Sequence, residues 1–306
     1  MKEKKKIGFE IWRLLYPIII YFAINIIVTI TVVIVIIMNL SAEGMDYVLV
    51  GEMAVQKVMD KALLITIITS VICLFVFIPL YFGDKKKEKK LGALVKYENA
   101  KIDKWILVAI LGFSAALCLN ILISYTGLAE KSPGFDVVSE AIYESSLFIQ
   151  ILATVILAPI IEELLVRGLI YKRMTRWTSP LIAALASSAL FGLIHMNLVQ
   201  FVYAFLIGLL LALVYEKFQN IWAPILFHFA ANATSIMITN IPGAEELFES
   251  SVNTITICVI TGLAMITLTY YFLKMEKVSG EKIEIEDIVG LESQMQVQEK
   301  EKELYK

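Results

Sequence analysis

Residues 14–42, LLYPIIIYFAINIIVTITVVIVIIMNLSA, contain no charged side chain. A signal peptide has a shorter apolar region, of about 7–15 residues, that ends at a small-residue cleavage site. A stretch of this length is instead typical of a retained transmembrane helix, which needs about 20 apolar residues. The chain therefore begins with a segment that predicts a membrane protein.

The rest of the sequence repeats this pattern. The 306 residues are 58% hydrophobic and 18% charged, and the mean hydropathy is +0.76. Soluble domains have about 45–50% apolar and about 25% charged residues. Further apolar blocks lie at residues 62–83, 105–128, 146–175, 179–198, 199–215, 221–241 and 252–273. We therefore predict an all-α fold, a polytopic membrane bundle of about eight transmembrane helices.

Lysine and arginine are concentrated in alternate connections between these blocks. The rich connections carry Lys2, Lys4, Lys5, Lys6 and Arg13, then eight lysines between Lys85 and Lys104, then Lys172, Arg173 and Arg176, and finally Lys217. The other connections contain only Lys57, Lys61 and Lys131. Because basic residues favour the cytoplasmic side, both termini are expected to be cytoplasmic in a multi-pass protein of the cell membrane.

We divide the chain into four parts: N-terminal transmembrane helices and loops (1–145), a core (146–240), a last transmembrane helix (241–273) and a polar cytoplasmic tail (274–306). The tail is expected to be a short amphipathic helix or disordered. The lysines at 85–90 either contact anionic lipid headgroups or only determine topology.

The net charge and the cysteine positions indicate which classes of partner and metal site to expect. The net charge of -2 provides no basic field, so we expect membrane lipids and no nucleic acid as partners. The three cysteines lie in different apolar blocks, and their spacing resembles no zinc motif. They are predicted to act as small hydrophobic residues that face lipid or the core.

Three short segments place ionisable groups inside the apolar core blocks, where each charge costs about 2.5–3.5 kcal/mol. These groups are Glu162, Glu163 and Arg167 in the fourth block, His195 in the fifth, and His228 and Asn232 in the seventh. The chain has two histidines, and both fall here. Helix rise places Glu162, His195, His228 and Asn232 within about two turns of one depth, so we expect one shared polar centre.

Spacing within each helix supports this expectation. Glu163 and Arg167 are four residues apart and can pair, whereas Glu162 points about 100° away. His228 and Asn232 are also four apart and face one direction. The small residues at 183–189 allow close helix approach.

Two prolines precede these groups, Pro159 in the fourth block and Pro224 in the seventh. A proline inside a helix kinks it. Two interpretations stay open: the kinks open a wet cavity, or they serve packing alone.

The motifs EExxxR (Glu162, Glu163, Arg167), FxxxH (Phe191, His195) and HxxxN (His228, Asn232) resemble the three motifs of the CPBP family, also called Abi. This family contains type II CAAX prenyl endopeptidases and bacteriocin-processing proteins. The resemblance covers residues 146–240. It implies an eight-helix intramembrane endopeptidase that cleaves a membrane-associated peptide, a lipidated CAAX-like protein or a bacteriocin-type precursor.

The resemblance also implies roles. Glu162 resembles the residue that activates water, and His195 resembles its partner. Glu163 and Arg167 resemble a supporting pair. His228 and Asn232 resemble the groups that stabilise the oxyanion.

A metal mechanism is an alternative to a glutamate-activated water. Glu162, His195 and His228 have the ligand types of a catalytic His₂Glu zinc site. The sequence contains no HExxH and no close pair of histidines. We favour the metal-free form, with zinc bound by these three residues as the alternative.

Two functions of other classes compete. A non-proteolytic immunity or scaffold protein would act by binding alone, but it has no need to bury two carboxylates. A proton-coupled transporter would use buried Glu and His as a relay. The sequence shows no internal repeat that would indicate one.

Overall fold

The computed structural model describes residues 2–90, 95–97, 100–132, 134–278 and 280–282. In chain order the elements are α1 (Lys2–Ala42), α2 (Tyr47–Met59), α3 (Ala62–Lys90), β1 (Val95–Tyr97), α4 (Ile102–Ser124), η1 (Ala129–Lys131), α5 (Phe135–Tyr143), α6 (Leu147–Gln150), η2 (Ile151–Leu157), α7 (Ala158–Glu163), η3 (Leu164–Tyr171), α8 (Lys172–Met174), α9 (Pro180–Leu193), α10 (Leu198–Phe218), α11 (Trp222–Asn240), η4 (Glu245–Phe248), α12 (Ser251–Lys274) and β2 (Gly280–Lys282).

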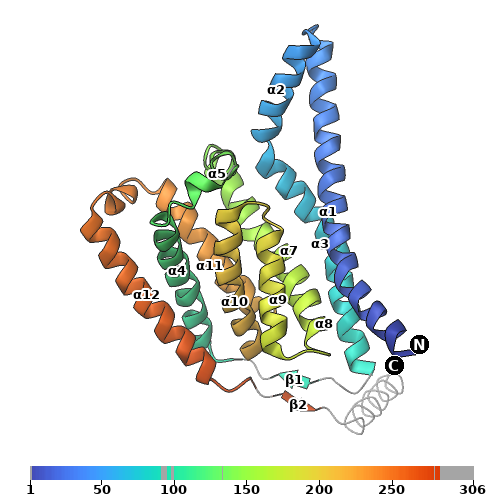
Figure 1. Cartoon of the computed structure of the whole chain (residues 1–306), viewed down its shortest axis with the longest axis vertical. Coiled ribbons are helices and arrows are strands. Elements are labelled where there is room, and N and C mark those ends of the chain that lie inside the picture. The colour runs from blue at the N-terminus through green and yellow to red at the C-terminus, as the bar shows by residue number, and fades with distance from the viewer. Residues whose placement is uncertain (1, 91–94, 98–99, 133, 279, 283–306) are drawn as a thin grey trace, which may run out of the picture.

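The predicted all-α membrane bundle is confirmed (Figure 1). Six helices in the described part of the chain are long and apolar enough to cross a membrane: Gly8–Ala42, Ala62–Glu88, Ile102–Ser124, Leu147–Met174, Leu198–Phe218 and Ser251–Lys274. The other two predicted blocks also form helices, but they differ from these six. Helix α9 has 14 residues, about 21 Å, which is shorter than a bilayer core of about 30 Å. Helix α11 has 19 residues and carries the polar side chains of His228 and Asn232.

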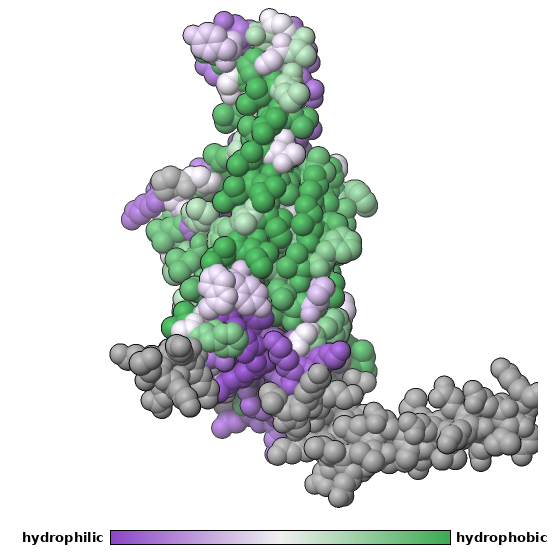
Figure 2. All heavy atoms as spheres, turned by 90° about the vertical axis from the view of Figure 1, so that its right-hand side faces the viewer, coloured by the Kyte–Doolittle hydropathy of each residue, from purple (hydrophilic) through white to green (hydrophobic). Residues whose placement is uncertain are grey.

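The outer surface suits a lipid environment. Figure 2 shows a broad apolar surface on the side formed by α1 and α3, and a hydrophilic zone at the end where α1 begins. On α1, Ile19, Ile26 and Ile30 are all more than half exposed, with exposed fractions of 53%, 55% and 52%. Exposed apolar patches of this extent on a helical bundle are typical of a lipid-facing surface.

Helices α4 and α11 pack closely against each other in the interior of the bundle. A Cβ atom on Gly112 of α4 would lie 2.3 Å from the carbonyl oxygen of Phe227 in α11. The two backbones can therefore touch only because position 112 is glycine. This contact fixes α11 at the residue immediately before His228.

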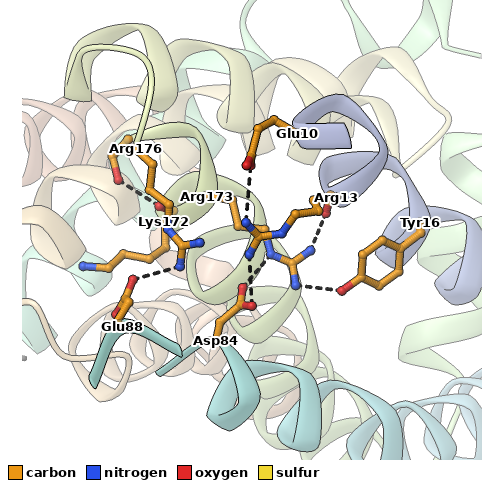
Figure 3. Close-up of polar contacts among 9 residues, drawn as sticks. Glu10, Arg13, Tyr16, Asp84, Glu88, Lys172, Arg173 and Arg176 are labelled. Atoms are coloured by element: carbon orange, nitrogen blue, oxygen red, sulfur yellow. Dashed lines mark hydrogen bonds and ion pairs between the residues drawn. The ribbon is translucent and has the colours of Figure 1, made fainter. Parts of the chain in front are cut away.

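A network of charged side chains ties α1, α3 and α8 together at the end of the bundle where α1 begins (Figure 3). Arg173 is 1% exposed and donates from Nε to Oδ2 of Asp84 at 2.7 Å and from Nη2 to the hydroxyl of Tyr16 at 2.9 Å. It also donates to the backbone carbonyl of Arg13, whose own Nη2 donates to Oδ1 of Asp84 at 3.1 Å. Because α8 is the last part of the helical stretch Leu147–Met174, which holds Glu162, this network anchors one end of that stretch.

Several elements were not predicted. Helix α2 lies in the polar connection 43–61, where Asp46 caps its first turn by accepting from the amide of Val48 at 2.9 Å. Helix α5 lies in the connection before the fourth block, and α3 continues through the lysine run to Lys90. Strands β1 and β2 pair antiparallel and join the connection after α3 to the segment after α12. Most of the predicted tail, residues 283–306, lies outside the described residues.

Candidate functional site

The helical stretch Leu147–Met174 presents the paired glutamates. Two π-helical segments, η2 and η3, flank the short α7 that carries them. Pro159 lies in the first turn of α7, directly after η2, and supplies no backbone N–H to that stretch. π-Helical segments within α-helices occur frequently at functional sites.

Glu163 and Arg167 form the predicted ion pair. Both side chains are fully buried, and Nη1 of Arg167 donates to Oε1 of Glu163 at 2.8 Å. Nη2 of Arg167 donates to the carbonyl oxygen of Gly208 in α10 at 3.0 Å, and its guanidinium lies 4.7 Å from the ring centre of Phe191. Arg167 is therefore an interior group of the bundle.

His228 lies between the two glutamates. Its Nδ1 is 3.0 Å from Oε1 of Glu163, and its Nε2 is 3.7 Å from Oε2 of Glu162. Because a carboxylate accepts, Nδ1 carries the proton that Glu163 binds. The side chains of Glu162 and Glu163 point in different directions, as expected. Both nevertheless reach the imidazole of His228, Glu163 at Nδ1 and Glu162 at Nε2.

His195 does not lie within a helix, which corrects its predicted place in the fifth span. Helix α9 ends at Leu193, and His195 lies in the turn that leads to α10, next to Met196 in the left-handed region at φ 59°. Nδ1 of His195 donates to the carbonyl of Phe191 at 2.7 Å. In the neutral ring Nε2 is then an acceptor. Among the described residues, no hydrogen bond or ion pair joins His195 to Glu162.

The ring of Phe191 connects the two histidines. It makes edge contacts with His195 at a centroid distance of 5.1 Å and with His228 at 5.7 Å. Because its face also covers Arg167, one aromatic side chain fixes three of the predicted groups.

Asn232 has a backbone partner that the sequence did not indicate. Its Nδ2 donates to the carbonyl of Thr154, in η2, at 2.7 Å. Pro224 lies in the first turn of α11, where its missing N–H leaves no helical bond broken, so its position does not require the kink expected from a proline inside a helix. The side-chain amide of Asn232 thus joins α11 directly to η2, the π-helical segment before the glutamates.

A cavity of about 440 Å³ brings four of the predicted residues together, Glu162, His195, His228 and Asn232. Its wall also includes apolar side chains of α5, namely Phe135, Val138 and Ile142. Small-molecule and peptide-binding sites typically enclose about 300–1,000 Å³ and combine an apolar wall with a few convergent polar groups. Glu163 and Arg167 lie behind this wall and support His228.

Sequence reasoning missed the partners that hold the motif residues in place. Gly208 accepts from Arg167, and Thr154 accepts from Asn232, in both cases through backbone oxygens. A backbone acceptor leaves no side-chain signature. The one available signal was Gly208 within an apolar helix, which is typical of a close helix contact.

The zinc alternative does not fit this geometry. No group of three His, Cys, Asp or Glu side chains in the described ranges is placed to hold a metal ion. Glu162 and His228 are neighbours, but His195 does not complete a ligand set with them. We therefore assign no step to a metal.

Comparison with known proteins agrees with the motifs. Residues 144–234, which include all six predicted site residues, match the family model described as type II CAAX prenyl endopeptidase Rce1-like. The chain is 25% identical over 206 residues to the Bacillus subtilis (strain 168) protein named "Putative membrane peptidase YdiL", which covers 66% of this chain and 82% of that protein. No solved structure matches the chain. The predicted resemblance to the CPBP family of membrane proteases is confirmed over residues 144–234.

Proposed function

We propose that this protein is an intramembrane endopeptidase that hydrolyses a peptide bond of a membrane-associated substrate with a water activated by Glu162. The observation that carries the proposal is the shared cavity, because a carboxylate, two imidazoles and an amide line one space large enough for a peptide segment. Hydrolysis needs an activated water, a stabilised oxyanion and a proton for the leaving amine, and these four side chains can supply all three.

Glu162 and His195 would act on the water. The side chain of Glu162 is 16% exposed and faces the cavity. Nδ1 of His195 is engaged with a backbone carbonyl, so its Nε2 is available to accept a hydrogen bond from the same water. Glu162 takes one proton as the water oxygen bonds to the scissile carbon. It returns that proton to the amine when the C–N bond breaks.

His228 and Asn232 would stabilise the oxyanion. Since Nδ1 of His228 donates to Glu163, donation from Nε2 to the oxyanion uses the imidazolium form, in which both ring nitrogens carry a proton. Asn232 has a second N–H besides the one that Thr154 accepts. Loss of one such donor typically costs about 2.7–4 kcal/mol of transition-state stabilisation.

The topology follows the distribution of basic residues. Arg13, Arg173 and Lys217 belong to the rich connections, and Arg13 and Arg173 meet in one network at the end where α1 begins. In the proposed orientation this end is cytoplasmic in the cell membrane, the chain crosses about eight times, and lipid covers the apolar surface. The substrate is a membrane-associated peptide or lipidated protein, with CAAX-like and bacteriocin-type precursors as the two classes.

Comparative peptidomics tests the proposal without a known substrate. Membranes from cells that express either the wild-type protein or Glu162→Gln are compared, and the substrate is the peptide that accumulates uncleaved with the variant. A synthetic copy is then assayed with purified protein in liposomes. We expect no cleavage by Glu162→Gln and normal cleavage by Glu140→Gln, which changes an exposed glutamate of α5. Normal cleavage by Glu162→Gln would refute the assignment.

A further inference from the structure

A second, smaller cavity lies against Glu162, bounded by the N-terminal helices. It has a volume of about 40 Å³ and is lined by residues of α1, α3 and α7. Six of its eight lining residues have polar side chains: Tyr21, Asn25, Thr66, Thr69, Ser70 and Glu162. Tyr21, Thr66, Ala158 and Glu162 line both cavities, so the two spaces meet at the proposed general base.

One buried side chain of this cavity, that of Thr69, has an unsatisfied hydroxyl group within the described residues. Thr69 is 3% exposed, and within the described ranges its Oγ1 has no hydrogen-bond partner. The hydroxyl of Thr66 on the same helix, by contrast, donates to the carbonyl of Ala62 at 3.0 Å. A buried hydroxyl without a partner costs about 1–3 kcal/mol, and a water molecule in the cavity would remove that cost.

The cavity is the right size and polarity for water. A buried water needs at least about 10–15 Å³ and two to four polar partners, so about three waters fit here. The six polar side chains of the lining can supply these partners.

We infer that this small cavity is a water-holding site that supplies the hydrolytic water to Glu162 while substrate fills the large cavity. The inference rests on the proposed function. A peptide segment in the large cavity excludes bulk water, yet each turnover consumes one water molecule. The small cavity provides that molecule from behind the substrate. Thr69, Ser70 and Asn25 are therefore positioning residues that lie outside the segment matched by the family model.

A labelling experiment tests the water directly and needs no substrate. X-ray radiolysis of bound water produces hydroxyl radicals that oxidise adjacent side chains, and mass spectrometry locates the products. Ile161 and Leu165 are both 1% exposed, but of the two only Ile161 lines the small cavity. We expect Ile161 to be oxidised faster than Leu165 in the wild-type protein, and Ser70→Leu, which fills the cavity, to abolish the difference. Equal labelling of the two residues in the wild-type protein would overturn the inference.

Kinetics with the identified peptide test the supply role. Thr69→Val keeps the shape but removes the hydroxyl, and we expect kcat to fall by about tenfold, as loss of one or two net hydrogen bonds would cause, with KM unchanged. Thr69→Ser should restore kcat, and Thr31→Val on the exposed face of α1 should have no effect. An unchanged kcat for Thr69→Val alongside an inactive Glu162→Gln would overturn the supply role and leave the proposed function intact. Activity in Glu162→Gln would instead refute the proposed function, whatever the labelling shows.

Discussion

Nδ1 of His228 is bonded to Oε1 of Glu163 at 3.0 Å, and the same oxygen accepts from Arg167 at 2.8 Å. One buried carboxylate oxygen therefore fixes both the ring that lines the cavity and the cation that lies behind it. This arrangement resembles the way a carboxylate orients histidine in hydrolytic sites, where the second ring nitrogen faces the reaction. The stability of the site and its chemistry thus both depend on the Glu163 carboxylate.

Removing Arg167 should destabilise the protein strongly. Arg167→Met leaves Glu163 as a fully buried carboxylate without its cation, and we expect a loss of about 3–5 kcal/mol in the free energy of unfolding. Unfolding in mixed detergent micelles measures it. The double variant Glu163→Gln/Arg167→Met should recover part of this stability but not the cleavage rate, because His228 then has no anion at Nδ1.

An exposed ion pair provides the control for this measurement. Arg176 and Glu88 also pair, at 2.9 Å, but their side chains are 30% and 25% exposed. Arg176→Gln should change stability by at most about 1 kcal/mol. Equal losses for Arg167→Met and Arg176→Gln would contradict the importance of the buried pair.

Gly208 should tolerate no side chain. A Cβ there would lie 2.9 Å from Cβ of Ser188 and 3.2 Å from Nη2 of Arg167. We expect Gly208→Ala to destabilise the protein by about 1–3 kcal/mol, since overpacking forces α9 and α10 apart. Thermal unfolding followed by circular dichroism checks it. Ser188→Gly in the same chain should recover part of the loss.

Gly83→Ala is the matched control, because nothing lies within 4 Å of a Cβ at that helical position of α3. It should leave the melting temperature unchanged or raise it slightly, as alanine is the better helix former. A Gly208→Ala protein as stable as Gly83→Ala would show that α9 and α10 are not held at the described distance.

Asp84 should be the critical member of the charged network. It accepts from both Arg13 and Arg173, and Arg173 is buried. Asp84→Asn leaves Arg173 without its anion, so we expect a loss of about 3–5 kcal/mol in unfolding free energy. Tyr16→Phe removes only one hydrogen bond from Arg173 and should cost about 1–3 kcal/mol. An Asp84→Asn variant no less stable than Tyr16→Phe would contradict this ranking.

The membrane class and the buried ionisable groups of the core could be predicted from the sequence, because both depend on residue types. Uncharged blocks such as residues 14–42 determine which segments enter a membrane, and the cost of a buried charge singles out Glu162, Glu163 and Arg167. The i, i+4 pairing of Glu163 with Arg167 also follows from helical geometry alone, and the structure contains it.

The parts that could not be predicted depend on packing between helices. The end of α9 at Leu193, which places His195 in a turn, lies inside an apolar block, where Gly192 could equally indicate a helix end or a close helix contact. The π-helical segments around α7 leave no compositional mark. Helix α2 lies between two predicted spans and is stabilised by apolar contacts with α1, through Val50 and Ala54 among others. Such contacts appear only when distant segments are placed side by side.

Two substitutions at His195 should separate its structural and chemical roles. An asparagine amide can occupy the place of Nδ1 and keep the hydrogen bond to the carbonyl of Phe191, but it offers no base at the position of Nε2. We expect His195→Asn to retain the wild-type melting temperature and to lose about 10²–10⁴-fold in kcat, the usual contribution of a positioned general acid–base group. His195→Gln, whose amide reaches the position of Nε2 but not that of Nδ1, should lose as much activity and also some stability. Assays on the identified peptide, paired with thermal unfolding, measure both effects. If His195→Asn cleaves at the wild-type rate, His195 serves only to hold the turn between α9 and α10, and Glu162 alone activates the water.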